Sequence, residues 1–90
     1  MMKITTLLAL ATLAASSLSM ASANCTPHPK AEWLSSSDAQ SKIVAMGYKI
    51  KKFKTSGQCY EIYGWNKEGK KAEVYFDTKT LEIVKSEIGD

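Results

Sequence analysis

The chain has few side chains of the types that carry out covalent chemistry, and they do not form a known catalytic pattern. A hydrolase needs a nucleophile, a base and a group that orients the base. The only histidine is His28, which lies between Pro27 and Pro29, and the serines at 35–37 are better explained as the start of a helix. We therefore predict no catalytic residue and expect that the protein is not an enzyme.

Cys25 and His28 have a Cys-x-x-His spacing, which occurs in metal sites. Nothing near them completes the three or four ligands that a zinc site needs, and a disulfide would remove the Cys25 thiolate. The chain also has no glycine-rich phosphate loop and no Cys-x-x-Cys-His haem motif. We predict neither a metal nor a cofactor.

Three aromatic side chains are the strongest candidates for binding a partner. Tyr63, Trp65 and Tyr75 fall on one face of a predicted hairpin, together with Glu61 and Glu73. Side-chain pairs across a hairpin stabilise it by ~0.2–1 kcal/mol each, which is the simpler interpretation. The functional interpretation is an exposed partner-binding face, because Tyr and Trp dominate binding hot spots.

A cluster of lysines precedes the hairpin, at Lys49, Lys51, Lys52 and Lys54. Lysine on an edge strand deters one sheet from pairing with another, so the simpler interpretation is a solvated basic edge. The alternative is an electrostatic guide for an acidic partner or for anionic lipid headgroups.

Residues 58–77 are the stretch that must position these side chains. Two sets of small or apolar residues alternate there with their neighbours: Tyr60, Ile62 and Gly64, then Ala72, Val74 and Phe76. A period of two predicts strands with one face in a core and the other in water. Residues 66–69 supply the polar side chains and the glycine of a hairpin loop.

A helix is predicted over residues 36–46. Ser35 and Ser37 are alternative caps for its first turn, and the sequence does not decide between them. Gly47 is expected to end it, because a residue after a helix commonly adopts a left-handed conformation. The single apolar stripe of this helix consists of Ala39, Ile43 and Met46.

Two further strands are predicted, at residues 48–55 before the hairpin and 81–86 after it. Phe53 is out of phase with the earlier residues of its strand, so either the strand bulges near 51–52 or Phe53 serves the opposite face. The predicted inner face of the sheet consists of Tyr48, Ile50, Tyr60, Ile62, Val74, Phe76, Leu81 and Ile83. The expected fold class is α+β: one N-terminal helix packed on a four-stranded antiparallel β-meander, in two layers, with one disulfide.

Residues 1–23 are predicted to be a secretory signal peptide. Lys3 gives a basic start, an apolar run follows at 4–15, and residues 21–23 fit the small-x-small cleavage pattern. The run is too short to span ~30 Å of hydrocarbon, so we expect no stable membrane insertion. We therefore predict cleavage after Ala23, a periplasmic or secreted location, an extended N-terminal arm at 24–35 and one domain at 36–90.

Cys25 and Cys59 are the only cysteines, and both follow the predicted cleavage site. Disulfides persist in exported proteins, and a domain of this size is marginal by its core alone. We predict a bridge between them, which would stabilise the fold by ~3–4 kcal/mol through restriction of the unfolded chain. A redox-active or metal-binding pair is the alternative, but the two cysteines lack the close spacing of such sites.

The charged residues of the chain mainly indicate whether a nucleic-acid partner is to be expected. The formal net charge is +3, and all 12 basic residues are lysines. Recognition of phosphates and bases favours the bidentate fork of arginine, so no nucleic-acid partner is expected.

Three segments of the chain follow one another in a familiar order. They are Ala-Met-Gly-Tyr at 45–48, Gly-Gln-Cys-Tyr-Glu-Ile-Tyr at 57–63, and Lys-Glu-Gly-Lys-Lys-Ala-Glu-Val-Tyr-Phe-Asp at 67–77. This series resembles the PepSY domain, most closely the small exported bacterial proteins with a signal peptide and one such domain. The resemblance covers about residues 25–85. Family members often have glycine four residues after the final Asp, where this chain has Leu81.

The resemblance implies a helix packed on an antiparallel sheet and a non-catalytic module. PepSY domains occur in propeptides of thermolysin-type metallopeptidases, and a role in restraining protease activity is proposed for the family. We therefore expect an exported binding module that modulates an unidentified protein partner, such as a peptidase or an envelope protein. The alternative is a periplasmic accessory protein that senses a small molecule or a metal.

Overall fold

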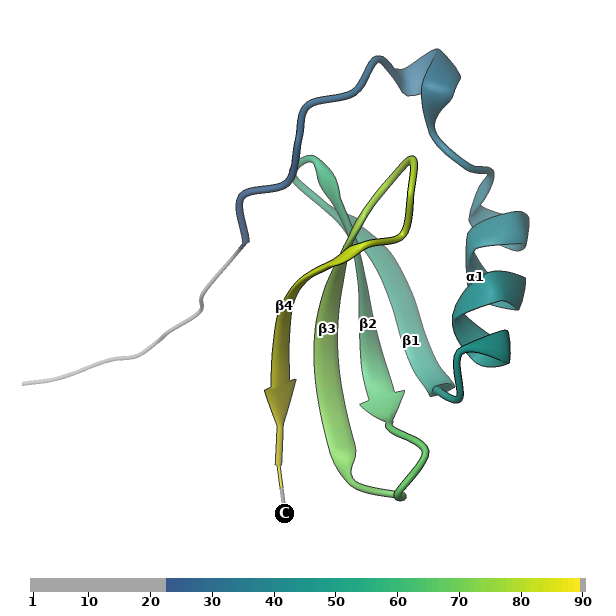
Figure 1. Cartoon of the computed structure of the whole chain (residues 1–90), viewed down its shortest axis with the longest axis vertical. Coiled ribbons are helices and arrows are strands. Elements are labelled where there is room, and N and C mark those ends of the chain that lie inside the picture. Colours follow the sequence, from purple (N-terminus) through teal and green to yellow (C-terminus); the bar gives the residue numbers. More distant parts are fainter. Residues whose placement is uncertain (1–22, 90) are drawn as a thin grey trace, which may run out of the picture.

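The computed structural model describes residues 23–89 of the chain, so the predicted signal peptide lies outside the described residues except for Ala23. The elements run in the order η2 (Lys30–Glu32), α1 (Ser36–Ala45), β1 (Lys49–Ser56), β2 (Cys59–Trp65), β3 (Lys71–Asp77) and β4 (Ile83–Ile88). Figure 1 shows the four strands side by side, with α1 beyond β1 and the arm crossing one end of the sheet.

The strands form one antiparallel sheet in the order β1-β2-β3-β4, each paired with its neighbour in the chain. The prediction of one α-helix, a four-stranded antiparallel sheet and a Cys25–Cys59 disulfide is confirmed. The helix is not N-terminal in the chain, however, because the arm and η2 precede it. It begins at Ser36 and comes before all four strands.

Helix α1 uses the first of its two start signals. The Ser35 hydroxyl accepts a hydrogen bond from the Asp38 backbone N–H at 3.0 Å, which satisfies one of the free N–H groups of the first turn. The helix ends at Ala45, and Gly47 follows with a φ of 106°, as expected of a residue that must leave the right-handed region.

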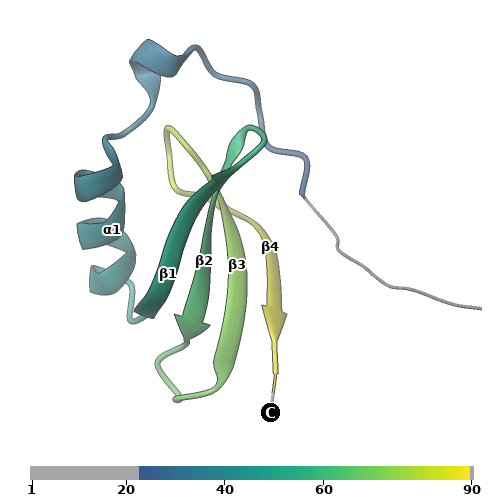
Figure 2. The same cartoon turned by 180° about the vertical axis from the view of Figure 1, so that it is seen from behind.

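One hydrophobic core joins α1 to the inner face of the sheet. Its buried members are Ala39, Ile43, Tyr60, Ile62, Ala72, Val74, Phe76 and Leu81. Two residues expected there are exposed instead, Met46 (43%) and Ile83 (42%). Met46 follows the last turn of α1, and Ile83 belongs to β4, which Figure 2 shows at the far side of the sheet from the helix.

Strand β1 contains the bulge that its sequence allowed. Ile50 pairs with Gly64 and Lys52 with Tyr63, so Lys51 is the extra residue. This insertion lets Ile50 and Phe53 both pack against the core, and the alternative with Phe53 on the opposite face is wrong.

Gly64 permits an unusually close approach of β1 to β2. A Cβ atom at this position would lie 1.8 Å from the carbonyl oxygen of Lys49. No side chain fits there, so the glycine is required by packing between backbones and not by its φ angle.

The connection between β3 and β4 is built around Asp77. Its Oδ1 accepts hydrogen bonds from the backbone N–H groups of Lys79 (2.8 Å) and Thr80 (2.9 Å). Leu81 then takes a φ of 62°, the conformation that glycine adopts freely, at a cost of about 1–2 kcal/mol for a residue with a side chain. Strand β4 begins at Ile83 and not at Leu81 as predicted, because Leu81 belongs to this turn and reaches the core from it.

The arm is held at several points along its length. Cys25 is bonded to Cys59, with 5.4 Å between their Cα atoms. His28 Nε2 lies 3.0 Å from Asp77 Oδ2, and the Trp33 indole N–H donates to the His28 carbonyl at 2.9 Å. The Leu34 N–H donates to the Thr78 carbonyl at 2.9 Å.

Replacing Gly64 by Ala is expected to destabilise the fold by about 1–3 kcal/mol, because the added methyl group forces β1 and β2 apart at the bulge. Urea unfolding followed by circular dichroism measures this change. Gly89→Ala is the matched control, since a Cβ at that position meets its nearest atom at 3.6 Å, an ordinary contact. Equal stability of the two variants would contradict the close approach at Gly64.

Replacing Asp77 by Asn is expected to cost about 1–3 kcal/mol at pH 7, because the amide keeps an acceptor oxygen but loses the charge that faces His28. Burial opposes ionisation of Asp77, but N–H donors from Thr80 and Lys79 and the His28 ring outweigh it and lower its pKa below 3.8. The stabilisation is therefore present above pH 3.8 and lost as the pH falls through the lowered pKa. Unfolding curves between pH 2 and 7 test this, with the exposed Asp38→Asn as control.

Candidate functional site

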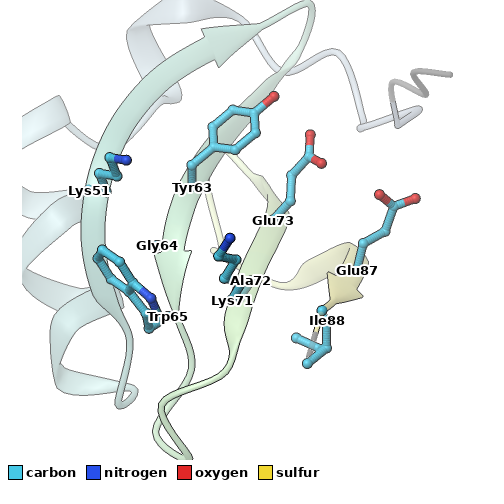
Figure 3. A pocket seen from close by; sticks show the side chains of 10 residues that line it. Lys51, Tyr63, Gly64, Trp65, Lys71, Ala72, Glu73, Glu87 and Ile88 are labelled. Atoms are coloured by element: carbon cyan, nitrogen blue, oxygen red, sulfur yellow. The ribbon is translucent and has the colours of Figure 1, made fainter. Parts of the chain in front are cut away.

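The outer face of the sheet carries the side chains that alternate with the core residues. Across the β2–β3 hairpin, Tyr63 is opposite Glu73 and Trp65 is opposite Lys71. Glu73 is in turn opposite Glu87 of β4. Figure 3 shows Tyr63, Glu73 and Glu87 projecting on the same side, in a row across β2, β3 and β4.

An open hollow of about 430 Å³ lies on this outer face. The central hairpin supplies Tyr63, Trp65, Lys71 and Glu73 to its lining. The C-terminal end of β4 supplies Glu87 and Ile88, and Gly89 follows that strand. Lys51 of the β1 bulge contributes from the other side. The surface therefore combines two aromatic rings with two ammonium groups and two carboxylates.

The structure divides the three aromatic residues that were predicted to share an exposed face. Tyr63 is 37% exposed and Trp65 is half-buried, and both line the hollow. Tyr75 shares the same face but is only 4% exposed, so the expectation of an exposed Tyr75 is wrong. The arm explains the difference, because Cys25 and Ala23 pack with Cys59 against Tyr75.

The lysine cluster and the aromatic face form a continuous surface. Lys51 lines the hollow, and Lys49 and Lys52 are opposite Trp65 and Tyr63 in the β1–β2 register. Lys54 Nζ lies 5.7 Å from the centre of the Tyr63 ring and 3.8 Å from Glu61 Oε1. Lysines of the cluster therefore lie beside the aromatic residues of the outer face.

Glu61 and Glu73 form a carboxyl pair that the sequence analysis missed. Glu61 is 2% exposed, although it lies on the outer face, and Glu73 is half-buried. The Tyr75 hydroxyl donates to Glu73 Oε2 at 3.1 Å. Because Glu61 is opposite Tyr75 and Glu73 is opposite Tyr63, the two carboxyl groups are diagonal neighbours. The register of the hairpin could have indicated that the two carboxyl groups are neighbours, but it does not indicate that Glu61 is buried.

The pKa values of the two carboxyl groups are shifted in opposite directions. Burial raises the pKa of Glu61 above 4.5, and its hydrogen bond with Glu73 adds to the shift. Burial acts in the same direction on Glu73, but hydrogen bonds from Glu61, Tyr63 and Tyr75 outweigh it and lower the pKa of Glu73. Glu61 is therefore the member of the pair that keeps its proton to the higher pH, and Glu73 is the member that ionises first.

The tyrosine hydroxyl groups beside this pair are held in the protonated form. The hydrogen bond with Glu73 raises the pKa of Tyr63 to about 12, with burial as the next cause. Burial is the main reason that the pKa of Tyr75 is also raised. The site thus presents phenol donors and ammonium groups around the carboxyl pair.

Residues 23–89 contain no group of three or more His, Cys, Asp or Glu side chains placed to hold a metal ion. In the same part of the chain, no helix has the length and apolar character needed to cross a membrane.

A family model described as "Peptidase propeptide and YPEB domain" matches residues 4–87 of this 90-residue chain. The chain belongs to this PepSY family. The resemblance seen in the sequence is confirmed, and the match begins inside the predicted signal peptide. Comparisons with the curated proteins and with the solved structures give no match.

The geometry of the outer face of the sheet is suited to binding. Aromatic rings beside mixed charges are typical of surfaces that dock a protein or a small ligand. Leu81 has a left-handed φ of 62°, a conformation that glycine adopts freely.

Replacing Glu61 by Gln is expected to change how stability depends on pH. The folded protein holds the Glu61 proton more tightly than the unfolded chain, so wild type loses stability as the pH rises from 4.5 to the raised pKa. A glutamine has no proton to lose, so the free energy of unfolding of the variant should rise relative to that of wild type as the pH increases through this window. Glu73 has a lowered pKa, so its contribution to stability has the opposite pH dependence, below pH 4.5.

Urea unfolding at several values between pH 4 and 8 gives the required comparison. Glu68→Gln is the matched control, because Glu68 is exposed in the β2–β3 loop. A constant difference between wild type and Glu61→Gln across this range would show that Glu61 does not titrate with a raised pKa.

Proposed function

We propose that this PepSY chain is an exported, non-catalytic binding module that modulates a protein partner, such as a peptidase. The observation that carries the proposal is the hollow on the outer face, where Tyr63 and Trp65 are accessible among charged side chains. The partner docks there, and the basic cluster beside it orients an acidic region of that partner.

The chemistry of the hollow supports a protein segment as the bound group. Trp65 and Tyr63 offer large rigid contact areas, which lose little conformational entropy on binding. Lys51 and Lys71 lie near Glu73 and Glu87 around them, so the rim suits a mixed-charge segment. The hollow is open to solvent, which fits an inserted side chain or loop better than an enclosed metabolite.

Export is the second component of this proposal. A Cys25–Cys59 disulfide is consistent with an oxidising compartment, where such bonds persist. We propose a periplasmic or secreted protein that is cleaved after Ala23, with the arm at 24–35 leading into the domain at 36–90. The arm carries Cys25, so the mature chain retains the disulfide that covers Tyr75.

The family supports a peptidase as the first class of partner to test. Its description combines a peptidase propeptide with the YPEB domain, and a propeptide acts through contact with its enzyme. The open hollow offers a surface for such contact, so modulation by contact is the activity that we propose.

Replacing Trp65 or Tyr63 by Ala is expected to weaken partner capture at least tenfold, because each substitution removes a central ring from the hollow. The oxidised exported protein is immobilised and exposed to an envelope extract of the source organism, and mass spectrometry identifies what is retained. The activity of any retained peptidase is then measured on a peptide substrate with and without the purified protein.

Met46→Ala is the control, because Met46 is exposed on the helix side, away from the hollow. Wild type and this control should retain the same peptidase and change its activity, while the Trp65 and Tyr63 variants do neither at a nearly unchanged melting temperature. Capture that survives both aromatic substitutions would exclude the hollow as the docking site.

The same hollow favours a second candidate, a small-molecule accessory function, because about 430 Å³ lies within the range of small-ligand sites. A ligand that binds the native state raises the melting temperature, and the rise grows with the ratio of ligand concentration to Kd. A thermal-shift screen that includes metals and haem tests this candidate. A shift lost with Trp65→Ala would support it, and no shift across the screen would remove it.

A further inference from the structure

Strand β4 is the open edge of the sheet. It pairs with β3 on one side, and within the described residues no other strand pairs with its second side. Figures 1 and 2 both show α1 beside β1, at the opposite edge. An open edge presents backbone N–H and C=O groups that another strand can use.

The composition of β4 does not protect this edge as lysines protect β1. Half of the eight residues of β1 are lysines. Three of the six residues of β4 are large, apolar and exposed: Ile83 (42%), Val84 (42%) and Ile88 (47%). Apolar side chains on an open edge favour pairing with another strand.

The charges of β4 are incompletely compensated within the sheet. Glu87 is opposite Glu73 of β3, and like charges directly opposite one another destabilise a sheet. Its nearby cation is Lys85 of the same strand, with Nζ 3.4 Å from Glu87 Oε2. A basic residue opposite Glu87 on an added strand would offset the repulsion, and an acidic residue opposite Lys85 would complete the pattern.

We propose that β4 pairs with β4 of a second copy of this chain, antiparallel and centred on Ser86. In this register Lys85 of each copy is opposite Glu87 of the other, and Ile88 lies beside the bulge of the second copy, where Val84 is the extra residue of the β3–β4 register. The contact is two-fold symmetric, so it closes as a dimer, and it extends the sheet from four strands to eight.

The neighbouring registers explain why Ser86 is the centre. In a two-fold antiparallel contact, residues directly opposite each other must point to the same face of the sheet. The symmetry axis therefore passes between two copies of one residue, and each alternative register is centred on another single residue. Centring on Lys85 would place the two Lys85 side chains opposite each other, and centring on Glu87 would do the same for the glutamates. Centring on Ser86 instead forms two pairs of opposite charge, each between Lys85 of one copy and Glu87 of the other.

A second copy fits this edge better than an unrelated peptide does, because the edge is complementary to itself in both charge and apolar content. The inference does not depend on the proposed function, since it is argued from the pairing and charges of β4 alone, although Glu87 and Ile88 also line the hollow. Binding of a foreign extended peptide at β4 is instead one of the outcomes that the experiment distinguishes.

The test uses charge reversals in the oxidised protein exported by an expression host. Sedimentation equilibrium over a range of concentrations gives the dimer dissociation constant for wild type, Lys85→Glu, Glu87→Lys and the double variant. Each single reversal turns two attractive pairs into two repulsive ones and should weaken dimerisation roughly tenfold or more. The double variant restores opposite charges and should recover the wild-type constant.

Mixing the two single variants is the decisive arm. Lys85→Glu has acids at both positions and Glu87→Lys has bases at both, so together they should form a heterodimer although each alone is largely monomeric. The controls are Lys70→Glu and Glu68→Lys, which reverse charges in the exposed β2–β3 loop and should leave dimerisation unchanged.

Amide hydrogen exchange provides a second measurement on unmodified protein, and it covers the case in which a variant fails to fold. Protection of the β4 amides should increase with protein concentration. A wild type that remains monomeric with concentration-independent exchange overturns the proposal, and so does a dimer that is indifferent to both reversals. Protection of β4 only by an added foreign peptide would replace the second copy with that peptide.

Discussion

The pairing of β2 with β3 is the interaction on which the rest of this structure depends. Tyr60 is opposite Phe76 and Ile62 is opposite Val74, so one register places all four side chains in the core under α1. A slip of one residue would turn these apolar side chains outward and bring the outer-face carboxyl groups into the core. The arm, β1 and β4 are each attached to this hairpin, by the disulfide at Cys59 or by strand pairing.

Features that depend on local pattern were predictable from the sequence. The alternation along the hairpin, the Cys25–Cys59 bridge and the role of Gly47 each follow from a few adjacent residues or from the number of cysteines. The β1 bulge was one of two alternatives, and the structure decides between them. What failed depends on which distant segment covers a surface. Tyr75 looked accessible because its burial is caused by the arm, and Ile83 looked buried because the distance of β4 from α1 has no local signal.

The candidate site was predictable to the same extent. The sequence placed Tyr63 and Trp65 on the outer face, and the structure adds the hollow between them and the end of β4. The pairing of Glu61 with Glu73 needed the three-dimensional surroundings, because a carboxyl group on a solvent-facing position of a strand is normally solvated. Here the neighbouring tyrosines and Lys54 shield it, and burial raises its pKa because it disfavours the charged form.

The fastening of the arm has a consequence for proteolysis. A peptidase must draw its substrate into the active site as an extended strand free of other contacts, and exposed termini are the usual sites of such cleavage. This arm is held at Cys25, at His28 and at Leu34, so releasing a segment for cleavage requires opening of the β3–β4 turn and of the core as well. We therefore expect a small protein built in this way to resist digestion by peptidases.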